Sequence, residues 1–176
     1  VTAILRTDCD YITITDANET IDRIEGGAIV NLDNAFAMDI TDDVPNLMKA
    51  DFDLTCTDGT DTWVSRFAIR LHAPEFAFVG TVIEDSNGDG HVDSGETAIA
   101  HVTVKNTGLA TAPETHFSVF CDAPEITLVQ NEFLLGTIAS NSELTVDIPF
   151  TISENALLGD IYEIGFTVAS GHYSTS

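Results

Sequence analysis

The acidic segment 85–96 is the stretch whose residue types and spacing most clearly predict chemistry. It reads D-S-N-G-D-G-H-V-D-S-G-E. Oxygen-bearing side chains stand at positions 1, 3, 5, 9 and 12 of this loop, namely Asp85, Asn87, Asp89, Asp93 and Glu96. A calcium ion takes about six to eight oxygen ligands, so a chain that binds one must wrap around it. Gly90, at position 6, permits the sharp turn that directs the carbonyl of His91 inward as a further ligand. The segment therefore predicts a Ca²⁺ site with no other cofactor.

The sequences on either side of this loop indicate what kind of site it is. Residues 76–84 and 97–105 read as strands and not as the amphipathic helices of an EF-hand. We therefore expect a metal-binding loop that joins two β-strands and stabilises them. The alternative is a hydrated acidic hairpin without metal, in which the four carboxylates would repel one another.

The remaining reactive side chains do not form a catalytic pattern. His91 would bind the ion through its backbone carbonyl, so its imidazole takes no part in the predicted site. The other histidines have no Ser or Cys partner at motif spacing; they are His72, His101, His116 and His172. The thiols of Cys9, Cys56 and Cys121 lack Cys-x-x-Cys or Cys/His spacing, which disfavours zinc and redox chemistry. Either one disulfide with a free thiol or three buried thiols fits the sequence. We expect no enzymatic activity from this chain itself.

Aromatic residues raise a second class of function. Trp63, Tyr162 and Tyr173 could stack on sugars, and the alternative function is a carbohydrate-binding module appended to a secreted hydrolase. The segment 58–61, just before Trp63, has too few oxygens for a second metal site and favours a hairpin turn. An internal repeat puts Trp63 and Tyr173 near corresponding positions, which favours a structural role for both.

Composition limits the partners. The 176 residues include 29 acidic and 6 basic ones, and the net charge is −23. Nucleic acid is therefore excluded as a partner, because phosphate binding needs clustered Lys and Arg. The acidity is explained by a solvated, self-repelling surface, or in part by bound cations. No apolar run reaches the ~18 residues of a membrane helix, and the hydrophobic content of 44% indicates a folded chain.

Short alternating segments predict an all-β fold of sandwich type. Helical periodicity is nearly absent, and turn residues separate the apolar stretches. The expected strands cover residues 36–40, 52–56, 62–71, 76–84, 97–105, 144–152 and 162–168. Strands this short and this closely spaced favour two packed sheets.

The chain also repeats itself, which predicts two tandem β-sandwich domains. Residues 11–14 align with 125–128 and residues 49–56 align with 161–168. The predicted domains are 1–75 and 76–176, joined near residues 72–76. The first lacks counterparts of the strands at 76–84 and 97–105, and the second reaches its end where the counterpart of strand 62–71 begins. We expect both domains to be incomplete here and to continue into further β-structure of a longer, processed protein.

Residues 85–108 resemble the immunoglobulin-like modules of large secreted bacterial proteins. Similar modules follow gingipain-type cysteine peptidases and belong to the CARDB class of adhesion-type domains. The shared features are the acidic loop, the alternating strand after it and the K-N-T-G turn, and the turn-like segment 153–160 is similar as well. The resemblance implies a calcium-stabilised, immunoglobulin-like spacer or adhesion module, secreted or on the cell surface. Its partners would be neighbouring domains of the parent protein and a host or cell-surface protein or glycan.

Overall fold

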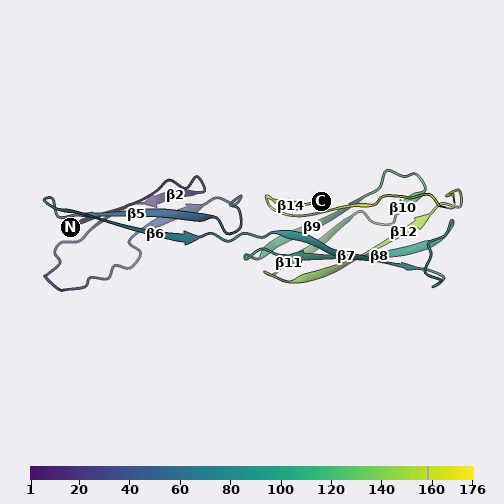
Figure 1. Cartoon of the computed structure of the whole chain (residues 1–176), viewed down its shortest axis with the longest axis horizontal. Coiled ribbons are helices and arrows are strands. Elements are labelled where there is room, and N and C mark those ends of the chain that lie inside the picture. The colour runs from purple at the N-terminus through teal and green to yellow at the C-terminus, as the bar shows by residue number, and fades with distance from the viewer. Residues whose placement is uncertain (158) are drawn as a thin grey trace. The chain divides into compact units, whose positions relative to one another are not determined.

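The computed structural model describes every residue of the chain except 158, and its regular structure there consists of β-strands alone. This confirms the all-β prediction. The chain divides into two compact units, Val1–His72 (unit 1) and Ala73–Ser176 (unit 2), each described below by itself (Figure 1). Among the described residues there is no helix long and apolar enough to cross a membrane.

Unit 2 contains two four-stranded antiparallel sheets. The first has the order β10-β12-β8-β7 and consists of β7 (Phe76–Asp85), β8 (Thr97–Asn106), β10 (Ile126–Leu128) and β12 (Glu143–Ile152). The second has the order β11-β9-β13-β14 and consists of β9 (Ala112–Phe120), β11 (Glu132–Ile138), β13 (Gly165–Ser170) and β14 (Tyr173–Thr175).

The core of unit 2 lies between these two sheets. Strand β8 alternates strictly, and its inward side chains are all buried: Ala98, Ala100, Val102 and Val104. From the other sheet, the fully buried ring of Phe117 meets the ring of Phe78 on β7 with centroids 6.3 Å apart. The sheets therefore pack face to face as a sandwich, stabilised by burial of their apolar faces.

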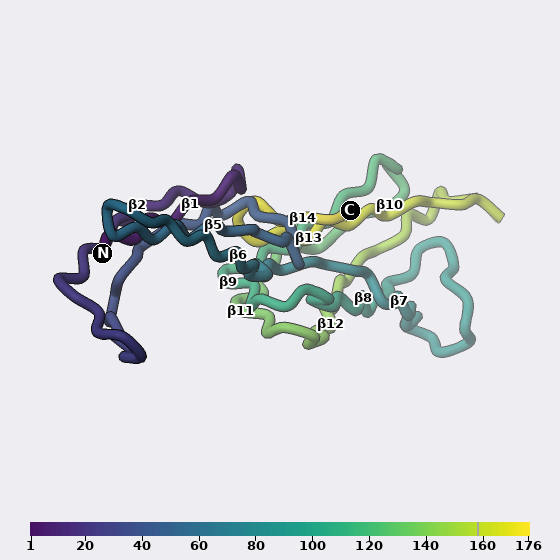
Figure 2. Tube along the Cα trace, turned by 60° about the vertical axis from the view of Figure 1, so that its left-hand side comes forward, coloured from purple at the N-terminus to yellow at the C-terminus, as the bar shows by residue number. Residues whose placement is uncertain are grey.

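Unit 1 is built on the same plan with fewer strands. One sheet has the order β3-β1-β5-β6, and a second pairs β2 with β4. The strands are β1 (Thr2–Thr7), β2 (Ile12–Asp16), β3 (Asn18–Thr20), β4 (Ala37–Ile40), β5 (Lys49–Thr57) and β6 (Thr62–Arg70). Phe52, buried in β5, stacks on Phe67 of β6 with centroids 5.1 Å apart. A long irregular connection joins β3 to β4 (Figure 2).

The sequence repeat is a structural repeat with the same strand registers. In unit 1, Ala3 lies opposite Cys56, and their aligned residues in unit 2, Phe117 and Val168, also lie opposite each other. Ile12 of β2 pairs with Ile40 of β4 in unit 1. In unit 2 the residues aligned with them, Ile126 of β10 and Ile152 of β12, also pair with each other. Unit 1 thus has a counterpart of every strand of unit 2 except β7 and β8.

The observed strand boundaries differ from the predicted ones by up to three residues. Strand β13 begins at Gly165 rather than at 162, and Tyr162 and Ile164, which precede it, line a cavity. At the end of unit 2, β14 pairs with β13 as β6 pairs with β5 in unit 1.

Candidate metal-binding loop

The acidic loop connects β7 to β8, two antiparallel neighbours in one sheet, and projects beyond their ends (Figure 2). Asp85, at loop position 1, is the last residue of β7, and Glu96, at position 12, directly precedes β8. Both are half-buried, whereas the loop residues between them are exposed. The two strands therefore fix the positions of the first and last predicted ligands, as expected for a metal-binding loop that joins two β-strands.

Side-chain oxygens organise the first half of the loop. Oδ2 of Asp85 accepts hydrogen bonds from the backbone N–H of Asp89 at 2.8 Å and of Gly90 at 3.3 Å. Oδ1 of Asn87 accepts from the N–H of Asp89 at 2.9 Å, and Oδ1 of Asp89 accepts from the N–H of His91 at 2.9 Å. These bonds wind the backbone into consecutive tight turns, of the kind that Asp and Asn side chains form with the chain ahead of them.

Glu96 closes the loop on itself. Its Oε1 accepts hydrogen bonds from the hydroxyl of Ser86 at 2.9 Å and from the N–H of Asn87 at 3.0 Å. Its Oε2 accepts from the N–H of Asp93 at 3.0 Å. The carboxylate at position 12 thus joins the beginning of the loop to position 9.

Both terminal carboxylates are held in the charged form. Desolvation raises the pKa of Asp85, but hydrogen bonds from backbone N–H groups outweigh it and place that pKa below its ordinary value. The N–H of Asp93 and the hydroxyl of Ser86 lower the pKa of Glu96, and they outweigh the rise caused by desolvation and, to a smaller extent, by the charge of Asp85. Both ends of the loop therefore favour a charged carboxylate.

The oxygen atoms of the predicted ligands suit a hard cation, but Asp85, Asn87, Asp89 and Glu96 here accept hydrogen bonds from backbone N–H groups of the loop. The predicted side-chain ligands offer only oxygen, which Ca²⁺ prefers to nitrogen or sulfur. Within the described residues, no three His, Cys, Asp or Glu side chains converge closely enough to hold one ion. Asp85, Asn87 and Asp89 lie around one turn and Glu96 contacts the backbone of Asn87 and Asp93. For these side chains to converge on one ion, they would have to rotate within a loop whose backbone is already wound.

A cavity of about 320 Å³ opens beside this loop in unit 2. Val92, Asp93 and Ser94 of the loop form part of its wall. Asp160 and Tyr162 also line it, and the hydroxyl of Tyr162 donates a hydrogen bond of 3.3 Å to Asp160. Its remaining lining is mainly apolar, with Ile83, Ile126, Phe150, Ile152 and Ile164 among the lining residues.

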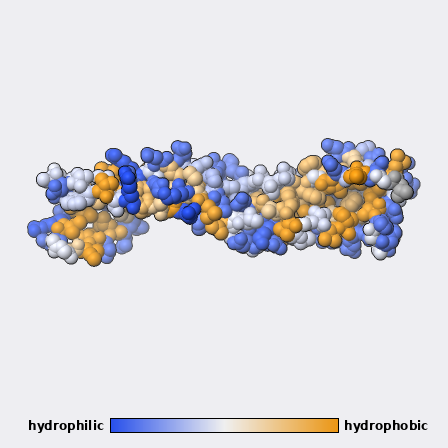
Figure 3. Space-filling view, in the orientation of Figure 1, coloured by the Kyte–Doolittle hydropathy of each residue, from blue (hydrophilic) through white to orange (hydrophobic). Residues whose placement is uncertain are grey.

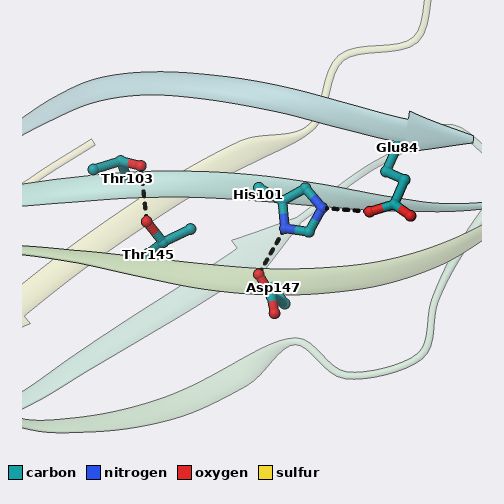
Figure 4. Close-up of polar contacts among 5 residues, drawn as sticks. All are labelled: Glu84, His101, Thr103, Thr145 and Asp147. Carbon is teal, nitrogen blue, oxygen red and sulfur yellow. Dashed lines mark hydrogen bonds and ion pairs between the residues drawn. The ribbon is translucent and has the colours of Figure 1, made fainter. Parts of the chain in front are cut away.

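His101, which the sequence predicts to be an ordinary residue on the face of a strand, contacts two carboxylates. Its Nδ1 lies 2.7 Å from Asp147 on β12, and its Nε2 lies 3.1 Å from Glu84 on β7 (Figure 4). Hydrogen bonds to Asp147 first, and then to Glu84, raise the pKa of the imidazole above its ordinary value. These contacts belong to a row of three polar pairs between β8 and β12, which can be recognised only once the strand register is known. The pairs are His101 with Asp147, Thr103 with Thr145, and Lys105 with Glu143.

The other predicted features have simple structural outcomes. Cys9, Cys56 and Cys121 are three half-buried free thiols. The hairpin between β5 and β6 is confirmed at 58–61, where Oδ1 of Asp58 accepts hydrogen bonds from the N–H groups of Thr60 and Asp61. The backbone N–H of Asp61, and then that of Thr60, hold the pKa of Asp58 below its ordinary value.

The aromatic residues are dispersed. Trp63 stands more than half exposed in unit 1. Tyr162 and Tyr173 are half-buried in unit 2, where Tyr173 packs against the hydrophobic core. Of the three aromatic residues that suggest carbohydrate binding, only Trp63 is exposed, and it belongs to a different unit from the two tyrosines.

Comparison of the chain with protein families, with curated proteins and with solved structures finds no match.

Proposed function

We propose that this chain is a non-catalytic structural module, a spacer or adhesion element of a larger secreted or cell-surface bacterial protein, and that Ca²⁺ bound by the loop 85–96 stabilises its second unit. Asp85, Asn87, Asp89, Asp93 and Glu96 would supply side-chain oxygens and His91 its carbonyl. The ion would fix the end of β7 to the start of β8, so that this end of the sandwich becomes rigid.

One observation carries this proposal. The loop has oxygen donors at every position of the calcium-loop pattern, and the backbone between the first and seventh positions is already wound by hydrogen bonds to those side chains. A pre-wound backbone reduces the conformational entropy that is lost when an ion orders the loop. Extracellular modules bind Ca²⁺ with dissociation constants of about 10⁻⁴ to 10⁻³ M, which supports a location where calcium is abundant.

The polar contacts of the sheets support a structural role in place of catalysis. His101, the histidine with the raised pKa, is held by a carboxylate from the strand on either side of it. Thr103 and Thr145, the next pair along the same strands, hydrogen-bond to each other at 3.0 Å. These side chains connect neighbouring strands, so we propose that surface polar groups here serve sheet stability and that neighbouring domains supply any activity.

Thermal unfolding in the presence and absence of calcium tests the proposal. At about 10 mM Ca²⁺, roughly a hundred times a dissociation constant of ~10⁻⁴ M, binding adds about 2.7 kcal/mol to the free energy of unfolding. For a unit of this size the melting temperature should rise by roughly 10–20 °C over the value in chelator. Mg²⁺ at the same concentration should give a much smaller rise, because it demands a tighter octahedral site.

Charge-matched variants separate a bound ion from general screening. Asp85→Asn and Glu96→Gln should each remove most of the calcium-dependent rise in melting temperature. Asp122→Asn, an exposed residue of unit 2 outside the loop, should keep the rise while changing the net charge equally. If chelator leaves the melting temperature unchanged, or if all three variants respond alike, the loop is not a structural calcium site.

A further inference from the structure

Unit 1 has a free sheet edge where unit 2 has a paired one. In unit 2, β12 pairs with β10 on one side and with β8 on the other, and β8 continues to β7. In unit 1 the counterpart of β12 is β4, which pairs with β2 and, among the described residues, with no second strand. The other edge of β4 therefore presents unpaired backbone N–H and C=O groups.

Apolar side chains along β4 are exposed where their counterparts are covered. Ile40 is 48% exposed, although its aligned residue Ile152 is half-buried. Phe36, just before β4, is half-buried, whereas Ile148, which the strand register makes its counterpart, is fully buried and pairs with Ala100 of β8. Apolar residues on β4 are therefore less covered than those on β12, and among the described residues no strand pairs with this edge of β4.

The facing sheet of unit 1 is also open. Residues paired directly across two strands point to the same face. Phe67 lies opposite the buried Phe52, and Trp63 lies opposite Cys56 on that same inner face. Yet Trp63 is 53% exposed and Phe67 is 45% exposed, and apolar surface is visible on unit 1 in the left-hand half of Figure 3.

Strand β7 provides the matching cover in unit 2. It lies against β14, the counterpart of β6. Its Phe78 packs on Phe117 and on Phe166, with ring centroids 6.3 and 6.0 Å away. Covering the β6 side of unit 1 therefore needs a second strand beyond the one that pairs with β4.

From these features we infer that unit 1 is a receptor for a two-stranded polypeptide β-hairpin of the β7–β8 type. One strand of the hairpin pairs antiparallel with the free edge of β4, and its inward residues are small or β-branched, as Ala98, Ala100, Val102 and Val104 are in β8. The other strand precedes it in the chain, as β7 precedes β8, and places an aromatic side chain over the inner face near Leu54, the counterpart of Phe166. Main-chain hydrogen bonds supply the register, and the apolar inner face supplies the specificity.

The register of the repeat defines the hairpin to use as a probe. Val1 aligns with Thr115, so a second copy of residues 73–114 placed directly before Val1 would continue into β1 as the original continues into β9. Trp63 is the one tryptophan of the chain and lies at the surface that the hairpin should cover. Its fluorescence therefore reports occupancy without any added label.

We expect the grafted hairpin to shield unit 1. Acrylamide quenching of Trp63 should fall severalfold and its emission should shift to the blue. Hydrogen exchange of the amides at 36–40 should slow by about tenfold or more, which corresponds to about 1.4 kcal/mol of added local stability. Exchange of β8 in unit 2 should stay unchanged, which verifies that the graft leaves the original sandwich folded.

Matched variants decide the outcome. A graft with Val102→Lys and Val104→Lys in the added copy alone should give no shielding, because lysines would enter the apolar interior. A peptide of residues 76–106 added in trans to the unmodified chain repeats the test if the graft misfolds. Unchanged quenching with both probes, or equal shielding by the lysine graft, would overturn the inference. So would concentration-dependent shielding of Trp63 in the unmodified chain with dimerisation in sedimentation, since a second copy would then be the occupant.

Discussion

His101 is held between two carboxylates on the exposed face of the β7–β8–β12 sheet. Asp147 comes from the strand on one side and Glu84 from the strand on the other, so an imidazolium at this point pairs with both neighbours of β8. Folding brings these three residues together, and the pKa of His101 is therefore higher in the folded than in the unfolded chain.

This arrangement predicts a pH-dependent contribution to stability. The stabilisation by protonated His101 is fully present below the unfolded pKa of about 6.5 and is lost as the pH rises through the higher folded pKa. The free energy of unfolding of His101→Gln, measured in urea from pH 5.5 to 9, should fall furthest below the wild type at the acidic end. The gap should close at alkaline pH.

His116→Gln is the matched control for this measurement. His116 is exposed on β9, in the other sheet of unit 2. Its replacement should leave the slope of stability against pH as in the wild type. The assignment fails if His101→Gln and His116→Gln give the same pH profile.

At the scale of elements, the turn after β8 ties three segments of unit 2 together through Asn106. This fully buried side chain accepts hydrogen bonds from the N–H groups of Glu75, at 3.2 Å, and Gly108, at 3.0 Å. It donates to the carbonyls of Ala110, at 2.8 Å, and Ile138, at 3.1 Å. The entry to β7, the β8–β9 turn and the end of β11 are therefore joined by one amide.

We predict that Asn106→Ala destabilises unit 2 by about 3 kcal/mol, because several buried backbone groups lose their partner. Urea unfolding followed by circular dichroism measures the loss. Asn131→Ala, at an exposed position of the same unit, should change stability by no more than about 0.5 kcal/mol. A similar small effect at Asn106 would mean that water replaces the amide without cost.

At the scale of the whole molecule, the chain forms two separate compact units. The hydrophobic core cluster around Phe117 draws all its members from unit 2. The acidic loop belongs to that unit as well. Because the proposed ion contacts only unit 2, its stabilising effect should be confined to one of the two units.

Hydrogen exchange on the full chain tests that confinement. Addition of Ca²⁺ should slow exchange in β7, β8 and β12 and leave the amides of β1 and β5 in unit 1 unchanged. The Glu96→Gln variant should abolish the difference. Equal slowing in both units would contradict a single ion site in unit 2 and favour a general screening of the net charge of −23.

Much of the fold follows from local pattern. The alternation of β8, the Asp58 hairpin and the repeat are all readable along the chain, because strand periodicity and turn chemistry are properties of neighbouring residues. The predicted loop ligands likewise depend on spacing alone. Tyr162 and Ile164 continue the alternating pattern of β13 although they lie before the strand, because residue types do not specify which backbone groups find a pairing partner.

The all-β class, the repeat and the oxygen-rich loop can be predicted without coordinates, since each depends on residue types at short or fixed separations. Which side chains meet depends on how the strands are ordered and paired in the folded chain. Asp147 reaches His101 from 46 residues away, and Glu96 closes the loop through backbone groups that have no signature in residue type. The free edge of β4 is likewise a property of sheet order, because a strand is an edge only relative to the strands that surround it.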